Sequence, residues 1–309
     1  MSHLVIVDGH AIAHRAYHSI PPLTTNGQPV NAIYGFYSMI LSSIEILKPN
    51  YLMVCLDSPG PNFRNQEFIG YRAKRKPADR ELISQLPQLP STLKKAGISH
   101  YAMGGFEADD LIATLAIKSL KKKSKLKITI ITGDKDLMQL VGPRVNLFVP
   151  IRGLSETKIY EPKDVKEKLG VNPNQVIDLK ALMGDMSDNY PGVAGIGPVV
   201  AVDLLEKYQT LDNIYEHLGE IKPSIREKLE KDKENAYLSQ KLATLVTNIP
   251  LKFTLKSARW TEKKFEDLLP LFQEYNFRSL ITRATKKLGL KPKKSSKKII
   301  IDSNQASLF

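Results

Sequence analysis

Runs of apolar, largely β-branched residues alternate with helical patterns along the first 172 residues of the chain. Strands are predicted at 4–7, 51–56 and 128–132, because such runs are typical of strands that are buried on both faces of a parallel sheet. Between the strands, apolar residues recur at helical spacing. The predicted helices are 11–18, 32–47, 81–95 and one that opens at 107. The alternation predicts an α/β domain over 1–172 with a doubly wound, mostly parallel sheet.

The pattern changes near Asn172, where strand signals give way to helices. Asn172 and Pro173 are typical of a helix start, and we expect a helical domain over 173–290. Its predicted helices are 176–183, 199–208, 224–230, 236–246 and 263–274. Residues 291–309 are lysine-rich without apolar periodicity, which predicts a flexible basic tail.

Acidic residues stand where the predicted strands end and at two further positions. The full set is Asp8, Asp57, Glu107, Asp109, Asp110, Asp134, Asp136, Asp185 and Asp188. Because the carboxyl ends of parallel strands meet at one crevice, we expect these acids to converge in space. Clustered carboxylates repel one another, and divalent cations relieve that repulsion. Oxygen-only ligands favour Mg²⁺, or alternatively Mn²⁺.

A simpler interpretation exists for each acid taken alone. An Asp after a strand is more often a turn residue or a helix cap than a ligand. The recurrence at several strand ends favours the metal site. His10, His14 and His18 share one helix face, and a zinc site there is an alternative. It is disfavoured because carboxylates select harder ions and no Cys or His elsewhere completes a set.

Composition is that of a soluble globular protein, with 42% hydrophobic and 25% charged residues among 309. No apolar run approaches the roughly 20 residues that span a bilayer, and no signal peptide is seen at the start, so no membrane partner is expected. Cys55 is the single cysteine, which fits a reducing cytoplasm. The net charge of +13, beside an acidic cleft, indicates a polyanionic substrate.

Basic residues flank the first two acidic strand ends. They are Arg15, Arg64, Arg72, Lys74 and Arg75. Arginine offers bidentate contact to phosphate and lysine a point charge, so we expect phosphate contacts, although an exposed basic loop would look the same.

A glycine-rich segment lies between two predicted helices. Gly192, Gly195 and Gly197, with Ile196 among them, predict a tight turn whose backbone N–H groups approach a phosphate. The following helix would direct its positive N-terminus at that phosphate. An ordinary turn is the alternative.

The last residues include Gln305, Leu308 and Phe309. Apolar side chains at the end of a basic tail are expected to insert into a pocket of a partner protein.

Together these segments resemble the bacterial 5′→3′ exonuclease and flap endonuclease family, which includes the N-terminal nuclease domain of DNA polymerase I and stand-alone versions of it. The resemblance covers about residues 3 to 288. The segments that carry it are 7–10, 23–27, 32–36, 107–110, 132–137 and 184–197. The implied fold is a PIN-like α/β domain followed by a helix-hairpin-helix (helix-three-turn-helix) module that binds DNA.

The resemblance also implies roles for residues. Two Mg²⁺ ions are expected, one near Asp8, Asp57, Glu107 and Asp109, the other near Asp134, Asp136 and Asp188, with Asp110 and Asp185 nearby. Arg72 and Arg75 would act at the scissile phosphate. Contacts to DNA would come from Arg15, Arg64, Tyr71, Lys74 and the hairpin, where a K⁺ ion is also expected.

The implied function is hydrolysis of phosphodiester bonds near DNA 5′ ends, flaps and nicks, or near RNA primers, without polymerase activity, by a monomer in the bacterial cytoplasm at the nucleoid. Gln305, Leu308 and Phe309 resemble a motif that binds the DNA sliding clamp. An endoribonuclease with a four-acid site, a purely architectural DNA-binding protein and a truncated DNA polymerase I are the alternatives.

Two positions depart from the family pattern. Arg72 and Val199 stand where many relatives have lysine. Arginine keeps the charge but changes its geometry, while valine removes a phosphate contact. Weaker binding of the downstream duplex is therefore expected.

Overall fold

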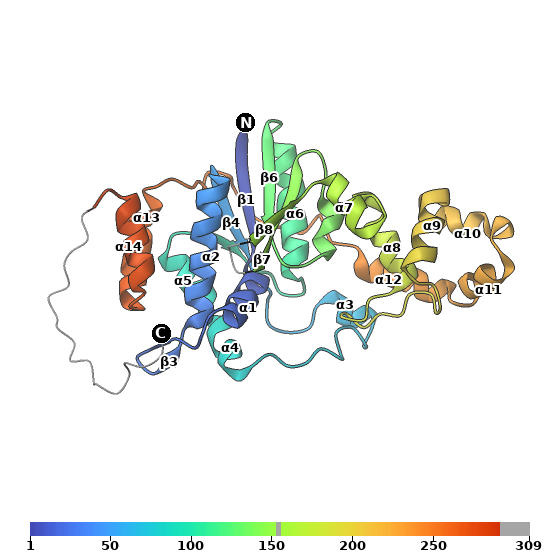
Figure 1. Ribbon diagram of the computed structural model, residues 1–309, viewed down its shortest axis with the longest axis horizontal. Coiled ribbons are helices and arrows are strands. Elements are labelled where there is room, and N and C mark those ends of the chain that lie inside the picture. Colours follow the sequence, from blue (N-terminus) through green and yellow to red (C-terminus); the bar gives the residue numbers. More distant parts are fainter. Residues whose placement is uncertain (153–155, 291–309) are drawn as a thin grey trace.

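The computed structural model describes residues 1–152 and 156–290. Its main sheet has six strands in the order β5-β4-β1-β6-β7-β8. The strands are β1 (Ser2–Asp8), β4 (Tyr51–Cys55), β5 (Ser99–Tyr101), β6 (Leu126–Ile131), β7 (Val145–Arg152) and β8 (Glu156–Tyr160). The first five pair in parallel and β8 is antiparallel to β7, which confirms the predicted mostly parallel sheet (Figure 1).

Fourteen α-helices accompany the sheet within the described residues. In the first half they are α1 (Gly9–Ser19), α2 (Asn31–Leu47), α3 (Phe63–Glu67), α4 (Arg80–Gln85), α5 (Leu89–Lys95), α6 (Ala108–Lys122) and α7 (Pro162–Leu169). In the second half they are α8 (Val176–Met183), α9 (Pro198–Tyr208), α10 (Leu211–Glu216), α11 (Pro223–Lys231), α12 (Lys233–Ala243), α13 (Lys264–Glu274) and α14 (Arg278–Lys287). A small hairpin joins β2 (Thr24–Thr25) to β3 (Gln28–Pro29).

The single helix predicted over 81–95 is interrupted. Instead, α4 is followed by a 3₁₀ turn at Leu86–Gln88 and then by α5. Pro87 and Pro90 lie in the first turns of the second and third pieces. Proline lacks the backbone N–H that a helix interior needs, and this explains the break.

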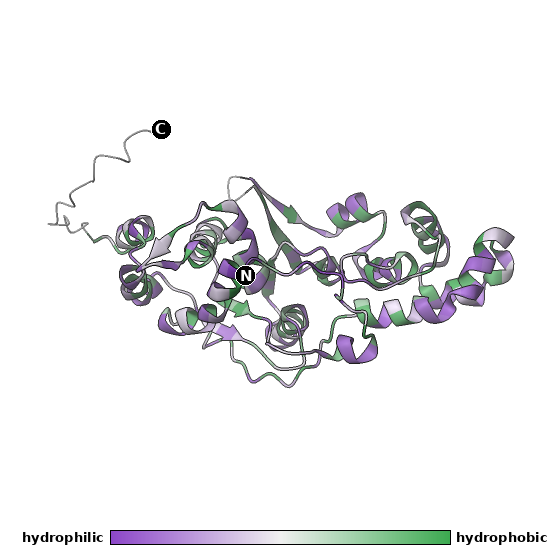
Figure 2. Ribbon diagram, turned by 90° about the horizontal axis from the view of Figure 1, so that it is seen from below, coloured by the Kyte–Doolittle hydropathy of each residue, from purple (hydrophilic) through white to green (hydrophobic). Residues whose placement is uncertain are grey.

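Side chains alternate along β1 between two hydrophobic cores. Leu4 and Ile6 pack with α6, while Val5 and Val7 pack with α1 and α2. Helices thus cover both faces of the sheet, as expected of a doubly wound fold. Figure 2 shows hydrophilic and hydrophobic residues sharing these helices, as is typical of helices with one buried face.

Helices α13 and α14 do not join the helical lobe formed by α8–α12. They return to the sheet and pack against α2, at the opposite end of the molecule from α9–α11 (Figure 1). The ring centroids of Tyr37 and Phe272 lie 5.5 Å apart, and those of Tyr34 and Phe277 lie 5.2 Å apart. The expected helical domain over 173–290 therefore divides in space, because these aromatic side chains complete the core beside α2.

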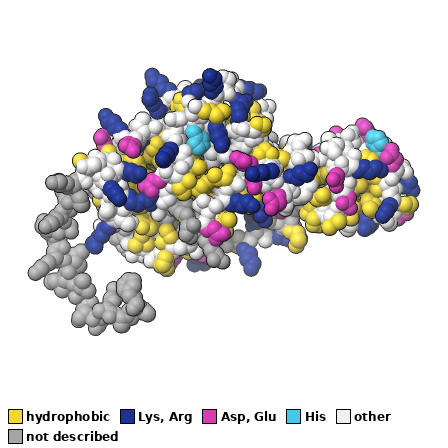
Figure 3. Space-filling model, turned by 45° about the horizontal axis from the view of Figure 1, so that its top comes forward, with side chains coloured by type: hydrophobic (Ala, Val, Ile, Leu, Met, Phe, Trp, Pro, Cys, Tyr) yellow, Lys and Arg dark blue, Asp and Glu magenta, His cyan; other side chains and the backbone are white. Residues whose placement is uncertain are grey.

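The lysine-rich end of α6 holds the connection between α12 and α13. Lys118 donates to the carbonyl of Ile249, and Lys122 donates to that of Phe253 at 3.2 Å. The Lys122 ammonium also lies 4.1 Å from the centroid of the Phe253 ring. These lysines stabilise a long connection. Figure 3 shows Lys and Arg side chains spread over one face of the molecule, with Asp and Glu among them.

Candidate metal centre and nucleic-acid site

Asp8 lies at the end of β1 and is also the N-cap of α1. Its carboxylate accepts from the amide of Ala11 at 3.1 Å and from the hydroxyl of Thr132 at 2.9 Å. Burial, with a smaller contribution from the charges of Asp57 and Asp134, raises the pKa of Asp8 to about 7. The helix-cap and the metal-site interpretations therefore describe the same side chain, since a cap hydrogen bond leaves other carboxylate lone pairs free.

Asp8 shares a cavity of about 220 Å³ with Asp57, Asp109 and Asp134, beside His10 and His14. Burial, then the charge of Asp8, raises the pKa of Asp109 well above its ordinary value. The backbone N–H of Asp57 donates to Nδ1 of His10 at 3.0 Å, so this nitrogen carries no proton. Acids from β1, β4, α6 and the loop after β6 thus meet at the carboxyl edge of the sheet, as the sequence predicted.

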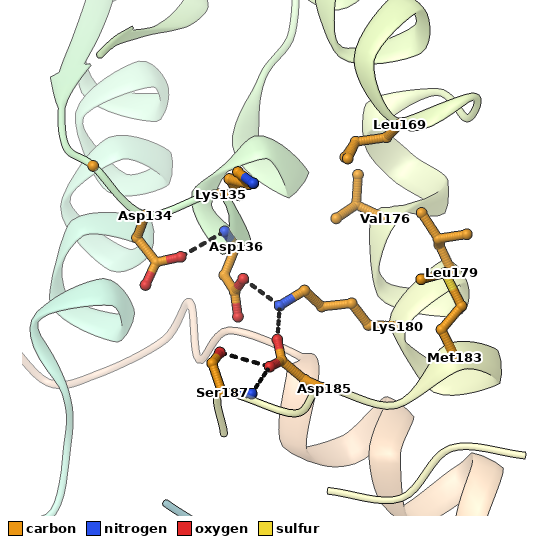
Figure 4. Close-up of a pocket in the computed structure, with 11 residues that line it drawn as sticks. Asp134, Lys135, Asp136, Leu169, Val176, Leu179, Lys180, Met183, Asp185 and Ser187 are labelled. Atoms are coloured by element: carbon orange, nitrogen blue, oxygen red, sulfur yellow. Dashed lines mark hydrogen bonds and ion pairs between the residues drawn. The ribbon is translucent and has the colours of Figure 1, made fainter. Parts of the chain in front are cut away.

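A second cavity, of about 420 Å³, adjoins the first through Asp134 (Figure 4). Asp134, Asp136 and Asp185 face it from one side, and aliphatic side chains of α8 form the opposite wall. Burial and the charge of Asp134 raise the pKa of Asp136 to about 7. Burial opposes ionisation of Asp185, but hydrogen bonds from Lys180 and Ser187 lower its pKa to about 2.

Lys180 is a functional candidate that sequence reasoning missed. Its ammonium donates to Asp185 at 2.6 Å and also to Asp136. Lys180 comes from the middle of α8, five residues before Asp185 and far from Asp136 in sequence. Asp185 lies beyond the end of α8, so no helical spacing links the two residues and no local signal indicated Lys180.

Of the remaining three acids, Glu107 and Asp188 are held together by basic and phenolic side chains. Arg72 donates to both, at 3.2 Å to Asp188, and Arg75 donates to Asp188 at 2.6 Å. The Tyr71 hydroxyl donates to Glu107 at 3.1 Å and to Asp188 at 3.0 Å. Tyr71 is only 4% exposed, so the expected direct contact with DNA is not supported, because its hydroxyl is directed at carboxylates in the interior.

Arg64 and Asp110 are also placed differently from the expectation. Arg64 is 2% exposed and Asp110 is fully buried, and two hydrogen bonds of 2.8 Å join them. The guanidinium therefore has no surface for a DNA phosphate, and the Asp110 oxygens face Arg64 rather than either cavity. Both expectations are corrected for the same reason: the two charges neutralise each other inside the protein.

Of the other basic residues, Arg15 and Lys74 lie nearer the surface. Arg15 is half-buried and donates to the carbonyl of Ile151, and Lys74 is exposed next to Arg75. Both positions are compatible with the expected phosphate contacts. Gln305, Leu308 and Phe309 lie outside the described residues.

The glycine segment forms a tight hairpin between α8 and α9. Gly192 and Gly195 have positive φ values of 64° and 78°, which favour glycine. Val193 and Ile196 are buried, so Ile196 anchors the hairpin and only its backbone remains near the surface. The Lys228 ammonium donates to the carbonyl of Gly195 at 3.1 Å, which brings a cation to the hairpin. The exposed Val199 lies in the first turn of the following helix, α9.

The donor set suits a hard cation, since all nine acids supply oxygen and two adjoining cavities collect six of them. As placed, no three His, Cys, Asp or Glu side chains of the described residues converge on one point that could hold an ion. Arg72, Arg75 and Lys180 lie between several of the carboxylates. The set of ligands implied by the family also divides differently here, because Asp185 rather than Asp188 shares a cavity with Asp136.

No helix within residues 1–152 and 156–290 is both long and apolar enough to cross a bilayer. A carboxylate cluster at the carboxyl edge of a parallel sheet, next to a glycine-rich hairpin between helices, is typical of nucleases whose carboxylates bind divalent metal ions. The chain belongs to the 5′-3′ exonuclease family. Residues 3–170 match the N-terminal resolvase-like domain of 5′-3′ exonucleases, and residues 171–266 match their C-terminal SAM-fold domain.

Curated relatives of this chain are bacterial DNA polymerases. It is 43% identical over 290 residues to DNA polymerase I of Caldicellulosiruptor bescii. The aligned region covers 93% of this chain and 33% of the relative. It is 35% identical over 282 residues to DNA polymerase I of Bacillus subtilis, with 91% and 32% covered. The chain thus spans about a third of the length of these relatives.

Among solved structures, the T5 D15 protein co-crystallised with metal ions has the same fold. The TM-score is 0.67 at 20% identity, over 92% of this chain and 99% of the T5 chain. At this identity the likeness concerns the fold.

Proposed function

We propose that this protein is a structure-specific 5′→3′ exonuclease and flap endonuclease that hydrolyses phosphodiester bonds near DNA 5′ ends. The observation that carries the proposal is the pair of adjoining cavities lined by six acids from distant parts of the chain, beside the hairpin at Gly192–Gly197. Family membership supports the same function.

Two Mg²⁺ ions, or alternatively Mn²⁺, are the proposed cofactors. Asp8, Asp57, Asp109 and Asp134 would hold one, and Asp134, Asp136 and Asp185 the other, with Glu107 and Asp188 at the edge of the site. When bound, such ions lower the pKa of a water molecule and stabilise the departing 3′ oxygen. The carboxylates would hold the metals and would not themselves be the nucleophile.

Arg72 and Arg75 are the proposed catalytic cations. Both guanidinium groups lie beside Asp188 at the mouth of the first cavity, where they can pair with the oxygens of a phosphate. Charge that develops on this phosphate in the transition state would be neutralised there. Lys180 and Lys135 supply further positive charge at the second cavity.

The hairpin is the proposed contact for the downstream duplex. Its exposed backbone at Ala194, Gly195 and Gly197 precedes α9, whose N-terminus favours an anion. Such contacts hold the DNA backbone without reading its sequence. Lys228 adds a cation at Gly195, and a K⁺ ion at the hairpin carbonyls remains a competing proposal.

The proposed substrates are DNA with a 5′ flap, nick or free 5′ end and RNA primers on DNA, cut by a monomer at the bacterial nucleoid in the cytoplasm. Cleavage of a 5′-labelled flap duplex, beside the matching single strand and with Mg²⁺ or EDTA, tests this directly. Cutting at the flap junction that requires the metal supports the proposal. Tight binding without cutting would favour an architectural DNA-binding protein, and preference for single-stranded RNA would favour an endoribonuclease.

We also propose that Gln305, Leu308 and Phe309 bind the DNA sliding clamp. The support is the pattern of the sequence, in which a glutamine precedes two large apolar residues on a basic segment. A chain that ends at Lys298 should lose clamp binding in a pull-down with purified clamp while flap cleavage without clamp is retained. Undiminished clamp binding would contradict this role.

A further inference from the structure

Arg64 and Asp110 form an ion pair in the interior of the α/β domain. Nη1 and Nη2 of Arg64 donate to the two carboxylate oxygens of Asp110 at 2.8 Å each. The other donors of the guanidinium also have partners, since Nε donates to the carbonyl of Leu242 at 2.8 Å and Nη2 to that of Thr244 at 3.1 Å. Charges are tolerated in an interior when they are paired in this complete way.

The same pair holds a candidate metal ligand. Arg64 Nη1 donates to the Glu107 carboxylate at 3.2 Å. The Asp110 carboxylate accepts from the backbone N–H of Glu107 at 3.2 Å. Both the backbone and the side chain of Glu107 are therefore fixed by one ion pair.

The pair also connects parts of the chain that are far apart in sequence. Arg64 belongs to α3, Asp110 to α6, and Leu242 and Thr244 to the end of α12. Asp110 adds a further contact to this last segment by accepting from the amide of Val246 at 2.9 Å. The end of the helical lobe is thereby held against the start of α6.

We propose that Arg64 is a positioning residue of the metal centre, with Asp110 as its buried counterion, and that the pair fixes Glu107 relative to the helical lobe without touching substrate. This inference rests on the proposed function and deepens it. On this assignment Arg64 does not contact DNA and Asp110 does not bind a metal ion. Side chains that orient metal ligands typically contribute about 10- to 100-fold to metal affinity.

Mn²⁺ binding measured by electron paramagnetic resonance, without DNA, separates this role from a phosphate contact. Arg64→Gln should bind Mn²⁺ about tenfold or more weakly, and Arg64→Lys should recover part of the loss. Duplex binding in Ca²⁺ should keep its dependence on salt. The matched variant Lys74→Gln, at an exposed position in the same segment, should show the opposite. Its Mn²⁺ affinity should be unchanged, and the slope of log DNA affinity against log salt concentration (the salt slope) should be smaller by about 0.9.

Removing one partner leaves a buried charge and can unfold the protein. The double variant Arg64→Met/Asp110→Leu removes both charges at similar volume, which is often neutral for stability, and its thermal melting shows whether it folds. We expect this folded variant to have weaker Mn²⁺ affinity and a lower kcat, with KM within about twofold of the original, because substrate contacts are unchanged.

Two results would overturn the inference. One is normal Mn²⁺ binding in Arg64→Gln together with a salt slope reduced like that of Lys74→Gln, which would make Arg64 a phosphate contact. The other is a folded double variant with unchanged Mn²⁺ affinity and kcat, which would make the pair purely structural. Because Mn²⁺ binding needs no turnover, a chain that binds Mn²⁺ but fails to cut flap DNA contradicts the proposed function alone.

Discussion

Glu107 and Asp188 accept hydrogen bonds from the same hydroxyl group, that of Tyr71, at 3.1 and 3.0 Å. Glu107 precedes α6 of the α/β domain, and Asp188 lies in the loop after α8. One phenol therefore sets the separation of two acids that come from different parts of the molecule. Arg72 reinforces the relationship by donating to both carboxylates.

Tyr71→Phe tests this relationship. Removing the hydroxyl takes one donor from each carboxylate, and hydrogen bonds to charged groups contribute about 1.5–3 kcal/mol. We expect single-turnover cleavage to fall roughly tenfold or more, at nearly unchanged duplex affinity, because Tyr71 has no exposed face for DNA. Tyr190→Phe is the control, since the buried Tyr190 hydroxyl has no hydrogen-bond partner among the described residues; an equal loss in both variants would contradict the assignment.

Asp134 lines both cavities, so its removal should affect both proposed ions. Asp134→Ala is expected to abolish cleavage of flap DNA while binding is largely retained, because loss of an acid lowers repulsion toward phosphate. Asp188→Ala should behave alike. A gel-based cleavage assay measures the first effect, and DNA binding in the presence of Ca²⁺ measures the second. Asp203→Ala, at an exposed position, is the control. Normal cutting by either variant would remove that acid from the site.

The stability of the metal-free protein should depend on pH through its buried acids. The pKa values of Asp8 and Asp136 are about 7, against 3.8 for an ordinary Asp. Between these values the folded chain binds more protons than the unfolded chain. Their contribution to the free energy of unfolding is therefore full below about pH 4 and is lost as pH rises through about 7.

Urea unfolding in EDTA at pH 5.5, 6.5 and 7.5 measures this trend. Asp8→Asn, which cannot titrate, should flatten the decline, whereas Asp203→Asn should not. Stabilisation by added Mg²⁺ should increase over the same range, because ligands must be deprotonated to bind metal. A decline in Asp8→Asn as steep as in the original protein would argue against the raised pKa.

Val199→Lys should tighten binding to the downstream duplex. Val199 is 73% exposed in the first turn of α9, next to the hairpin, and one added phosphate contact steepens the salt dependence by about 0.9 in log–log slope. Affinity for nicked duplex in Ca²⁺, measured from low to moderate salt, gives this slope. Ile159→Lys adds the same charge at an exposed site on β8. An unchanged slope in Val199→Lys would mean that this position does not meet phosphate.

Hydrogen exchange should divide the polar segment 58–79 into slowly and rapidly exchanging parts. Arg64 and Tyr71 are buried, and the amide of Arg72 donates to the carbonyl of Asp188 at 2.8 Å. We therefore expect slow exchange at Arg72 and fast exchange at the exposed Lys74 and Lys76. Uniformly fast exchange would instead mean that the whole segment opens readily in the absence of DNA.

The sequence alone determined three strands of the sheet and the location of the acidic edge, whereas β5, β7 and β8 were not predicted. Runs of β-branched residues identified β1, β4 and β6, since the periodicity of burial is a local property of the chain. Asp8, Asp57 and Asp134 were then expected to converge because parallel strands end at the same edge. The glycine hairpin was found for a similar reason, since its positive φ angles restrict which residues fit.

Only the tertiary structure decided which charged side chains face the cavities and which neutralise one another in the interior. Arg64 and Arg72 look alike in sequence, yet one is buried against Asp110 and the other reaches Glu107 and Asp188. Lys180 joined the site, and α13 and α14 returned to α2, without any local signal. The physical reason is that burial and ion pairing depend on partners from distant segments, and local periodicity carries no record of those partners.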